Sequence, residues 1–191
     1  GLRAHQRLLA MSLRLNRITL REIRLALREP FEISSGLTTD RRILLVELED
    51  VDGIKTWSEC VAGERPNFSA ETIDTAWLAI ADWLAPRVLT GSVPHPSALS
   101  EKLGTNIRGH RMARAALEMG GWALWATRES LSLSRAIGGT RRAIATGISL
   151  GIQQTPTVLV DKSLTAIEAG YRKIKIKIRP GADIEYIAAV R

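Results

Sequence analysis

The sequence predicts an α+β domain followed by the opening strand–helix units of a parallel α/β fold. In the first third of the chain apolar and polar residues alternate as in strands, and in the middle third apolar residues recur at helical spacing. After Arg142 a strand, a helix, a strand and a helix follow one another, which is the repeat of parallel α/β proteins.

Strand signals fill the first third of the chain and predict a three-stranded antiparallel meander. Apolar residues alternate with polar ones in three segments, residues 18–27, 42–49 and 54–61. A change of phase near Arg21 predicts a bulge in the first strand, and Pro30 is expected to end that strand. Residues 31–40 read as a loop, whereas Asp52-Gly53 predicts the hairpin turn between the second and third strands.

Helix signals follow a second predicted loop over residues 62–68. Ser69 is the expected N-cap of a helix that Pro86 ends or kinks, and a short helix is expected over residues 97–103. A longer helix begins near Gly109, with a Met and Trp stripe that is most simply core. Gly120-Gly121 weakens this helix by roughly 1 kcal/mol per glycine relative to alanine, so the pair predicts close packing against a neighbouring element.

After Arg142 the pattern changes to short buried strands and amphipathic helices. Residues 143–149 read as a strand, Thr155-Pro156 begins a helix, and Gly170 is its expected C-cap. A final helix follows Pro180-Gly181. The apolar faces expected to be buried are Val160, Leu164, Ile167 and Tyr171 in the first helix, and Ile184, Ile187 and Val190 in the last.

Between these two helices, charged and β-branched residues alternate strictly from Lys173 to Arg179, so a strand places isoleucines on one face and lysines on the other. In one interpretation the lysines lie on a solvated sheet face and discourage edge pairing. In the other they point into a closed site, where crowded ammonium groups withdrawn from water lose their charge more easily and one can act as a base. A helix-covered isoleucine face favours the second interpretation.

Composition limits the classes of function. The 191 residues carry a formal net charge of +7, but the arginines are scattered and no aromatic residues interleave them, so nucleic-acid binding is not expected. No stretch approaches the ~20 continuous apolar residues of a membrane span. Residues 1–11 lack the apolar core of a signal peptide and read as a leader or tag-like segment. The one cysteine, Cys60, excludes an internal disulfide and suits the cytoplasm.

Four stretches together resemble the o-succinylbenzoate synthase / N-acylamino acid racemase group of the enolase superfamily. In chain order they are Trp57-Ser58-Glu59-Cys60-Val61, Gly109 to Met119, Gly147 to Ile152, and Tyr171 to Gly181. Their order and spacing agree with the family over nearly the whole chain. The resemblance implies an α+β capping domain over residues 12–136, followed over residues 137–191 by the first two βα units of a (β/α)8 TIM-like barrel.

The resemblance also implies which lysines are catalytic. The K-x-K pair of the family aligns with Lys175 and Lys177. Lys177 is then expected to remove the proton α to the substrate carboxylate, and Lys175 to contact that carboxylate and assist Lys177. An alignment shifted by two residues would instead give these roles to Lys173 and Lys175.

Three further residues are implied to bind substrate. Ser149 matches a serine near the substrate in the family, although it could equally be a loop hydroxyl. Phe31 and Gly63 belong to the segments 31–39 and 62–68, which match the two loops that close over the substrate side chain.

Proton abstraction next to a carboxylate produces a dianionic enediolate that a metal must stabilise, and the resemblance implies magnesium, which prefers oxygen ligands. The carboxylate ligands of the family lie on later barrel strands, beyond the position of Arg191. The expectation is therefore that this chain holds no metal ligand and reads as a fragment that needs a C-terminal barrel segment or a companion chain. The complete protein is expected to be a homo-oligomer.

The expected function is metal-assisted α-proton abstraction from a small carboxylate substrate, with the fragment alone inactive. The reaction is either dehydration to o-succinylbenzoate in menaquinone biosynthesis or racemisation of N-acylamino acids. A dipeptide epimerase or a muconate-type cycloisomerase is an alternative within the same superfamily. An alternative of another class is a non-catalytic basic binding module or the non-catalytic partner of a second chain.

Overall fold

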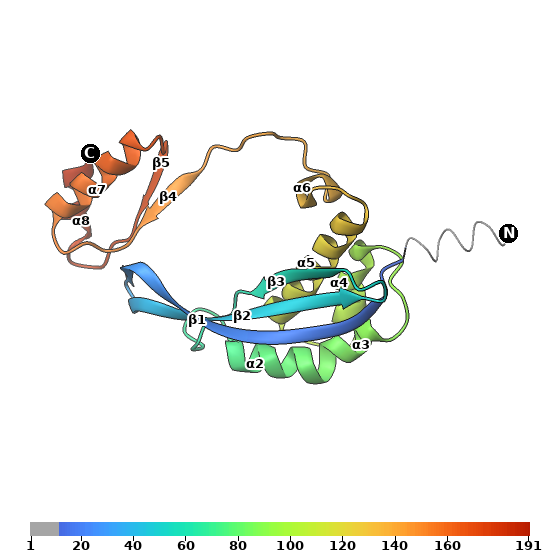
Figure 1. The fold of residues 1–191 in the computed structure, drawn as a ribbon. Helices are drawn as coiled ribbons and strands as arrows, with labels where there is room; N and C mark the ends of the chain where they lie inside the picture. Colours follow the sequence, from blue (N-terminus) through green and yellow to red (C-terminus); the bar gives the residue numbers. More distant parts are fainter. Residues whose placement is uncertain (1–11) are drawn as a thin grey trace. The chain divides into compact units, whose positions relative to one another are not determined.

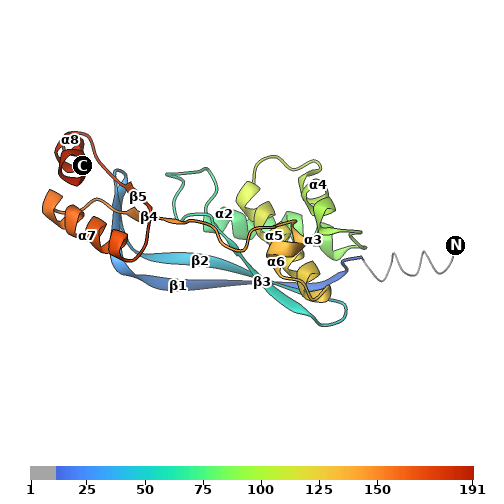
Figure 2. The ribbon, with the colours of Figure 1, turned by 90° about the horizontal axis from the view of Figure 1, so that it is seen from above.

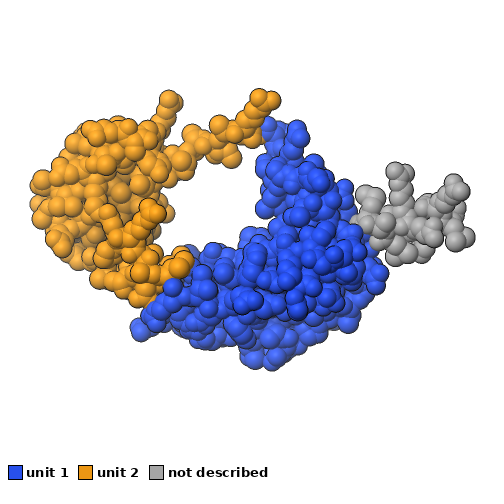
Figure 3. Space-filling view, viewed as in Figure 1, with its two compact units in different colours: residues 1–24, 42–140 blue, residues 25–41, 141–191 orange. Residues whose placement is uncertain are grey.

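The computed structural model describes residues 12–191, so the predicted leader over residues 1–11 lies outside the described residues. The chain divides into two compact units, coloured separately in Figure 3. Among the described residues, unit 1 contains residues 12–24 and 42–140, and unit 2 contains residues 25–41 and 141–191. The tip of the first β-hairpin therefore belongs with the C-terminal segment, whereas the base of the hairpin belongs with unit 1 (Figure 1).

A three-stranded sheet begins the chain and confirms the predicted meander. Its strands, in spatial order, are β1 (Leu15–Ile33), β2 (Gly36–Asp50) and β3 (Lys55–Cys60). β2 and β3 pair antiparallel, with Leu44 opposite Cys60 and Glu49 opposite Lys55. The Asp52-Gly53 turn is confirmed, because Gly53 has φ 83° and the Asp50 carboxylate accepts hydrogen bonds from the backbone of residues 52 and 54.

The first hairpin is longer than predicted. β1 does not end at Pro30 but continues to Ile33, and β2 begins already at Gly36, so the predicted loop over residues 31–40 is mostly strand. β1 is an edge strand, where a residue without a backbone N–H can face away from the neighbouring strand. This position explains why proline does not interrupt it.

The rest of unit 1 is helical, and Figure 2 shows its helices gathered on one side of the sheet. Its elements are α2 (Ile73–Leu78), the π-helix η1 (Ala79–Leu84), α3 (Ala85–Leu89), the 3-10 helix η2 (Pro96–Ala98), α4 (Leu99–Gly104), α5 (Arg111–Arg128) and α6 (Leu133–Ala136). None of the helices within residues 12–191 has the length and apolar character needed to cross a membrane.

The first helix departs from the prediction at its N-terminus. Its N-cap is Thr72, not Ser69, because Thr72 and Thr75 exchange side-chain and backbone hydrogen bonds in a capping box. Pro86 does not end the helical run. The N–H of Ala85 bonds to the carbonyl of Ile80, five residues back, so the helix widens to π spacing immediately before the proline that cannot donate.

The glycine pair in α5 confirms the predicted close packing. A Cβ added to Gly120 would lie 2.4 Å from Leu48 Cδ1, and one added to Gly121 would lie 2.2 Å from Leu99 Cδ1. Two hydroxyls of β3 bond to α5 across this contact, Ser58 Oγ donating to the Ala116 carbonyl at 2.7 Å and Thr56 Oγ1 to that of Gly120 at 3.2 Å. The backbone of α5 is therefore in direct contact with side chains of the sheet.

Unit 2 confirms the predicted strand–helix–strand–helix order. It contains β4 (Gly147–Leu150), α7 (Pro156–Glu168), β5 (Lys173–Ile176) and α8 (Asp183–Val190), and β4 and β5 pair in parallel. The side chain of Thr155 caps α7 by accepting from the N–H of Val158, and Gly170 follows the helix with φ 92°. These two strands do not close a barrel within the described chain.

The buried faces of the unit 2 helices differ from the prediction. Leu159, Ser163 and Ala166 are the buried residues of α7, whereas Leu164 and Ile167 are 53% and 57% exposed. In α8 the buried residue is Tyr186, and Ile184 is 81% exposed. Packing of α7 against β4 and α8 buries the face that carries Leu159 and Ala166 and leaves Leu164 and Ile167 exposed.

Candidate functional site

The alternating strand β5 has the predicted orientation. Ile174 and Ile176 are half-buried and pack against Leu159 and Tyr186 in the core of unit 2. Lys173 and Lys175 are exposed on the opposite face, and Lys177, just past the end of β5, is half-buried. The isoleucine face is therefore the helix side, and the lysines are free to line a surface on the other side.

The parallel register places Ser149 beside the lysines. Ser149 lies opposite Lys175 in the β4–β5 pairing, and both side chains are exposed. The N–H of Lys177 donates to the carbonyl of Leu150 at 3.0 Å, so the pairing continues beyond the regular strand. Since the carboxyl ends of parallel strands are where α/β folds place their ligands, Lys177 stands at the end of β5 where a site would form.

Phe31, from the tip of the first hairpin, lies at the loop that follows β4. The N–H of Ile152 donates to the carbonyl of Glu32 at 2.9 Å. A Cβ added to Gly151 would lie 3.1 Å from both the N and the O of Glu32, and 3.3 Å from Phe31 Cδ2. Unit 2 thus contains Phe31, Ser149, Lys175 and Lys177, all at or near the carboxyl ends of its two strands.

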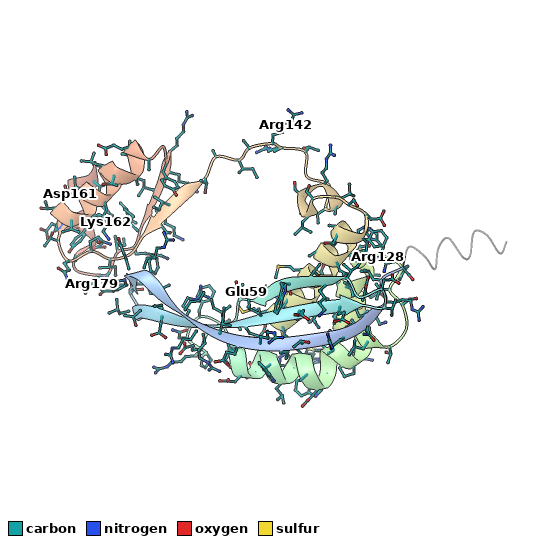
Figure 4. The ribbon with its side chains drawn as sticks, viewed as in Figure 1. Glu59, Arg128, Arg142, Asp161, Lys162 and Arg179 are labelled. Atoms are coloured by element: carbon teal, nitrogen blue, oxygen red, sulfur yellow. The ribbon has the colours of Figure 1, made fainter. Side chains whose placement is uncertain are left out.

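Two ion pairs fasten the hairpin tip within unit 2. Lys162 on α7 pairs with Glu29, and Arg179 after β5 pairs with Glu32 at 3.5 Å; Figure 4 labels both cations. The hydrogen bond from Lys162 lowers the pKa of Glu29. Exposed ion pairs contribute only about 0–1 kcal/mol each, so they orient the tip more than they stabilise it.

The loop after β4 is also held from α8, which the sequence did not indicate. Gln153 Nε2 donates to the carbonyl of Gly151 at 2.8 Å, and the hydroxyl of the buried Tyr186 donates to the carbonyl of Gln153 at 3.0 Å. The bond from Tyr186 to Gln153 joins residues 33 positions apart, and the bond from Gln153 to Gly151 lies within an irregular loop. No periodic pattern in the sequence indicates either bond. The available signal in the sequence was Tyr186 itself, since a tyrosine that becomes buried usually finds a partner for its hydroxyl.

Gly63 belongs to unit 1. Its carbonyl accepts from the N–H of Ile73 at 2.9 Å, and Gly63 and Thr72 form an isolated bridge that closes the loop between β3 and α2. Within this loop Phe68 is 93% exposed. The substrate-binding role of Gly63 stays a prediction.

Comparison with known proteins identifies the family. Residues 16–138 match the model of the mandelate racemase / muconate lactonizing enzyme N-terminal domain. The chain belongs to this family, within the enolase superfamily. It is 38% identical over 181 residues to an o-succinylbenzoate synthase of Geobacillus stearothermophilus, covering 95% of this chain and 48% of that protein.

Two further comparisons agree with this enolase-superfamily assignment. An N-succinylamino acid racemase of Thermus thermophilus is 38% identical over 179 residues, covering 94% of this chain and 48% of that protein. A crystal structure of an enolase-superfamily member from Listeria innocua has a TM-score of 0.86 and 32% identity, covering 94% and 48% of the two chains. The resemblance stated from the sequence is confirmed, and the chain spans about half the length of the relatives it matches.

The described part of this enolase-superfamily chain does not by itself form a magnesium site. Within residues 12–191, no group of three or more His, Cys, Asp and Glu side chains could hold a metal ion. Lysines on the exposed face of β5 are not ligands for magnesium, which prefers oxygen.

Cys60 and the start of α5 have structural roles. Cys60 is 1% exposed, and burial raises the pKa of its thiol, which disfavours a reactive thiolate. The N-terminus of α5 is capped by the carboxylate of Glu71, which accepts from the N–H groups of Met112 and Ala113 at 3.0 and 3.2 Å. The side chain of His110, the N-cap residue of α5, makes no capping hydrogen bond.

Proposed function

We propose that this chain supplies the base and a carboxylate-contacting lysine of an enolase-superfamily active site that abstracts a proton α to a carboxylate. The observation that supports this most is the β4–β5 register, which sets Ser149 opposite Lys175 on the face away from the isoleucine core. The position of Lys177 at the carboxyl end of β5, paired to Leu150, adds to it.

In this proposal Lys177 is the base. The neutral Nζ of Lys177 takes the α-proton, so the C–H bond breaks, an N–H bond forms, and the electron pair moves into the carboxylate as an enediolate. The ammonium group of Lys175 pairs with the substrate carboxylate and favours that charge. General base catalysis of this kind contributes typically 10²–10⁴-fold. When bound, a magnesium ion would stabilise the enediolate, and we propose that its carboxylate ligands come from a further barrel segment.

Phe31 and Ser149 are proposed to contact the substrate. Phe31 is held beside Gly151 by the backbone bond between Glu32 and Ile152. An aromatic ring there can cover an apolar part of the substrate, while the hydroxyl of Ser149, opposite Lys175, can bond to its carboxylate.

The lysine face needs a cover before it can work in this way, because Lys175 is exposed in this chain. We propose that a further barrel segment, in the same chain or as a companion chain, provides it. Large apolar side chains elsewhere on unit 2 are also exposed and offer further contact area for such a segment: Ile144 at 76%, Ile178 at 40% and Ile184 at 81%. Withdrawing water from the lysines would make loss of a proton from one of them easier.

Within the enolase superfamily we propose o-succinylbenzoate synthase or N-acylamino acid racemase activity, with a dipeptide epimerase as the alternative. The curated relatives named above include one of each of the first two. Both reactions begin with the same proton abstraction, so both use Lys177 in this proposal. We further propose that the complete enzyme is a cytoplasmic homo-oligomer, with the synthase reaction serving menaquinone biosynthesis.

The test is co-expression of the 191-residue chain with the C-terminal half of the Geobacillus stearothermophilus synthase, followed by purification of the complex. With magnesium in D2O, we expect the complex to exchange the α-proton of an N-succinylamino acid and the isolated chain not to. Lys175→Ala in the complex should weaken substrate binding as well as turnover. Exchange by the isolated chain, or none by a complex that co-purifies, would count against the proposal.

A further inference from the structure

Unit 1 contains a pocket that the enolase-superfamily assignment does not use. It is an open pocket of about 500 Å³ between η1, α3 and the turn from α4 into α5. Its lining includes Asp82, Trp83, Arg87, Asn106, Arg108 and His110, all within residues 42–140 of unit 1.

The backbone around this pocket departs from regular structure on both sides. Asp82 and Trp83 lie on the π-helix η1, a form that occurs frequently at functional sites. On the other side Asn106 and His110 have φ 57° and 48°, in the left-handed region that few residues other than glycine adopt, Asn and His being among those that adopt it most often. Such conformations cost of order 1–3 kcal/mol each and concentrate at binding sites.

An unsatisfied polar atom adds an independent observation. Nδ1 of His110 is buried and has no hydrogen-bond partner among the described residues. Most buried side-chain polar atoms are paired, and an orphaned one costs about 1–3 kcal/mol. The imidazole is held instead by an edge-to-face contact with Trp83, whose ring centroid is 5.3 Å away.

The chemistry of the lining indicates the ligand. Trp83 is 45% exposed, so its ring offers an aromatic wall beside the imidazole of His110. Arg87 and Arg108 bring two guanidinium groups, and Asp82 brings one carboxylate, which leaves a net charge of +1 with His110 neutral. The structure records no ion pair for these three charged groups within residues 12–191, and guanidinium forks match carboxylates in geometry.

We propose that this pocket binds a small aromatic monocarboxylate, with its carboxylate on Arg108 and Arg87 and its ring against Trp83 and His110. The proposal is independent of the lysines of β5. Arg87 already donates to the carbonyl of Thr105, so its guanidinium is positioned before a ligand arrives. Arg108 is exposed, so substituting it disturbs the fold little.

The test is titration of the ¹⁵N-labelled 191-residue chain with benzoate, followed by NMR of the tryptophan indole and backbone signals. Saturable shifts are expected at Trp83 and at residues 106–110. Benzamide, which has the same shape without the charge, should bind about tenfold more weakly, because it loses the charge-assisted bonds. Arg108→Gln should weaken benzoate binding to a similar extent, whereas Arg135→Gln, on exposed α6, should leave it unchanged.

Each other outcome would overturn the proposal. Absence of saturable shifts at Trp83 up to the solubility of benzoate would show that the pocket binds no such ligand. Equal binding of benzamide would show an apolar pocket without a carboxylate site, and tighter binding of inorganic phosphate would show a general anion site. His110→Asn keeps a residue that tolerates the left-handed conformation, so it removes the imidazole without straining the turn. This variant should bind benzoate more weakly, while its NMR spectrum should remain that of a folded protein.

Discussion

Gly120 of α5 lies so close to Leu48 of β2 that an added Cβ would approach Leu48 Cδ1 to 2.4 Å. Leu48 is fully buried, so it has little room to move aside. Gly120→Ala should therefore destabilise the protein by about 1–3 kcal/mol, as overpacking does, although alanine is the better helix former. Urea unfolding of the variant measures this.

A double-mutant cycle isolates the contact between these two residues. Leu48→Ala alone should cost about 2–5 kcal/mol by leaving a cavity. In that background the clash is gone, so adding Gly120→Ala should be neutral or stabilising. If Gly120→Ala costs the same in both backgrounds, the contact with Leu48 is not the reason for the glycine.

Arg128 neutralises a carboxylate that has no access to water. Asp50 is 0% exposed, and one of its oxygens lies 3.0 Å from Arg128 Nη1. Removing the cation leaves a buried charge uncompensated, so Arg128→Gln should cost about 3–5 kcal/mol of unfolding free energy. Arg135→Gln is the matched control and should stay within about 0.5 kcal/mol of wild type. Equal effects of the two substitutions would contradict the assignment.

Arg42 makes the stability of unit 1 depend on pH. It donates to both oxygens of Glu22 at 2.7 and 2.8 Å and to both oxygens of Asp74 at 2.8 and 3.2 Å. These hydrogen bonds lower the pKa of Glu22 and of Asp74 below their usual values of 4.5 and 3.8. A lowered carboxyl pKa means that the stabilisation is present above the usual value and is lost as the pH falls through the lowered one.

The measurement is urea unfolding of wild type and Arg42→Gln across the acidic range. The difference between their unfolding free energies should be constant at neutral pH and should shrink below about pH 4.5. A difference that persists unchanged at low pH would mean that Arg42 acts through packing and not through its two carboxylates.

Gly151 determines how closely the first hairpin tip approaches the loop after β4. A Cβ there would lie 3.1 Å from backbone atoms of Glu32, which cannot rotate away as a side chain can. Gly151→Ala should therefore loosen the bond between the Ile152 N–H and the Glu32 carbonyl. Hydrogen exchange at Ile152 should accelerate, whereas Gln154→Ala, in the same loop, should leave it unchanged. Unchanged exchange in both variants would show that the tip tolerates the methyl group.

The local sequence pattern predicted an element correctly where that pattern is compatible with few structures. The alternation after Lys173, the Asp52-Gly53 turn and the glycine pair in α5 each admit few structures; the turn and the close packing were confirmed, and the strand was confirmed over Lys173–Ile176. α7 was correctly predicted as a helix, but its predicted buried face was wrong, because the tertiary partners decide which side of the helix is buried. The predicted end of β1 at Pro30 was wrong, because the effect of a proline depends on whether its strand lies at the edge of the sheet.

The candidate site was predictable only in part, for the same physical reason. Lys175 and Ser149 follow from strand order and register, which short segments specify. The contact of Glu32 with Gly151 and Arg179 joins positions more than 100 residues apart, and no local preference marks it. The pocket beside Trp83 and His110 likewise depends on a π-helix and two left-handed residues that the sequence did not reveal.

The central claim is that Lys177 removes the α-proton. The most direct measurement is the rate of α-proton exchange by the purified complex with the complementary half, comparing Lys177→Ala with Lys173→Ala. We predict that Lys177→Ala lowers the rate by about 10²–10⁴-fold and that Lys173→Ala, four residues away on the same face, leaves it near wild type. Loss of exchange in Lys173→Ala with exchange retained in Lys177→Ala would contradict the claim.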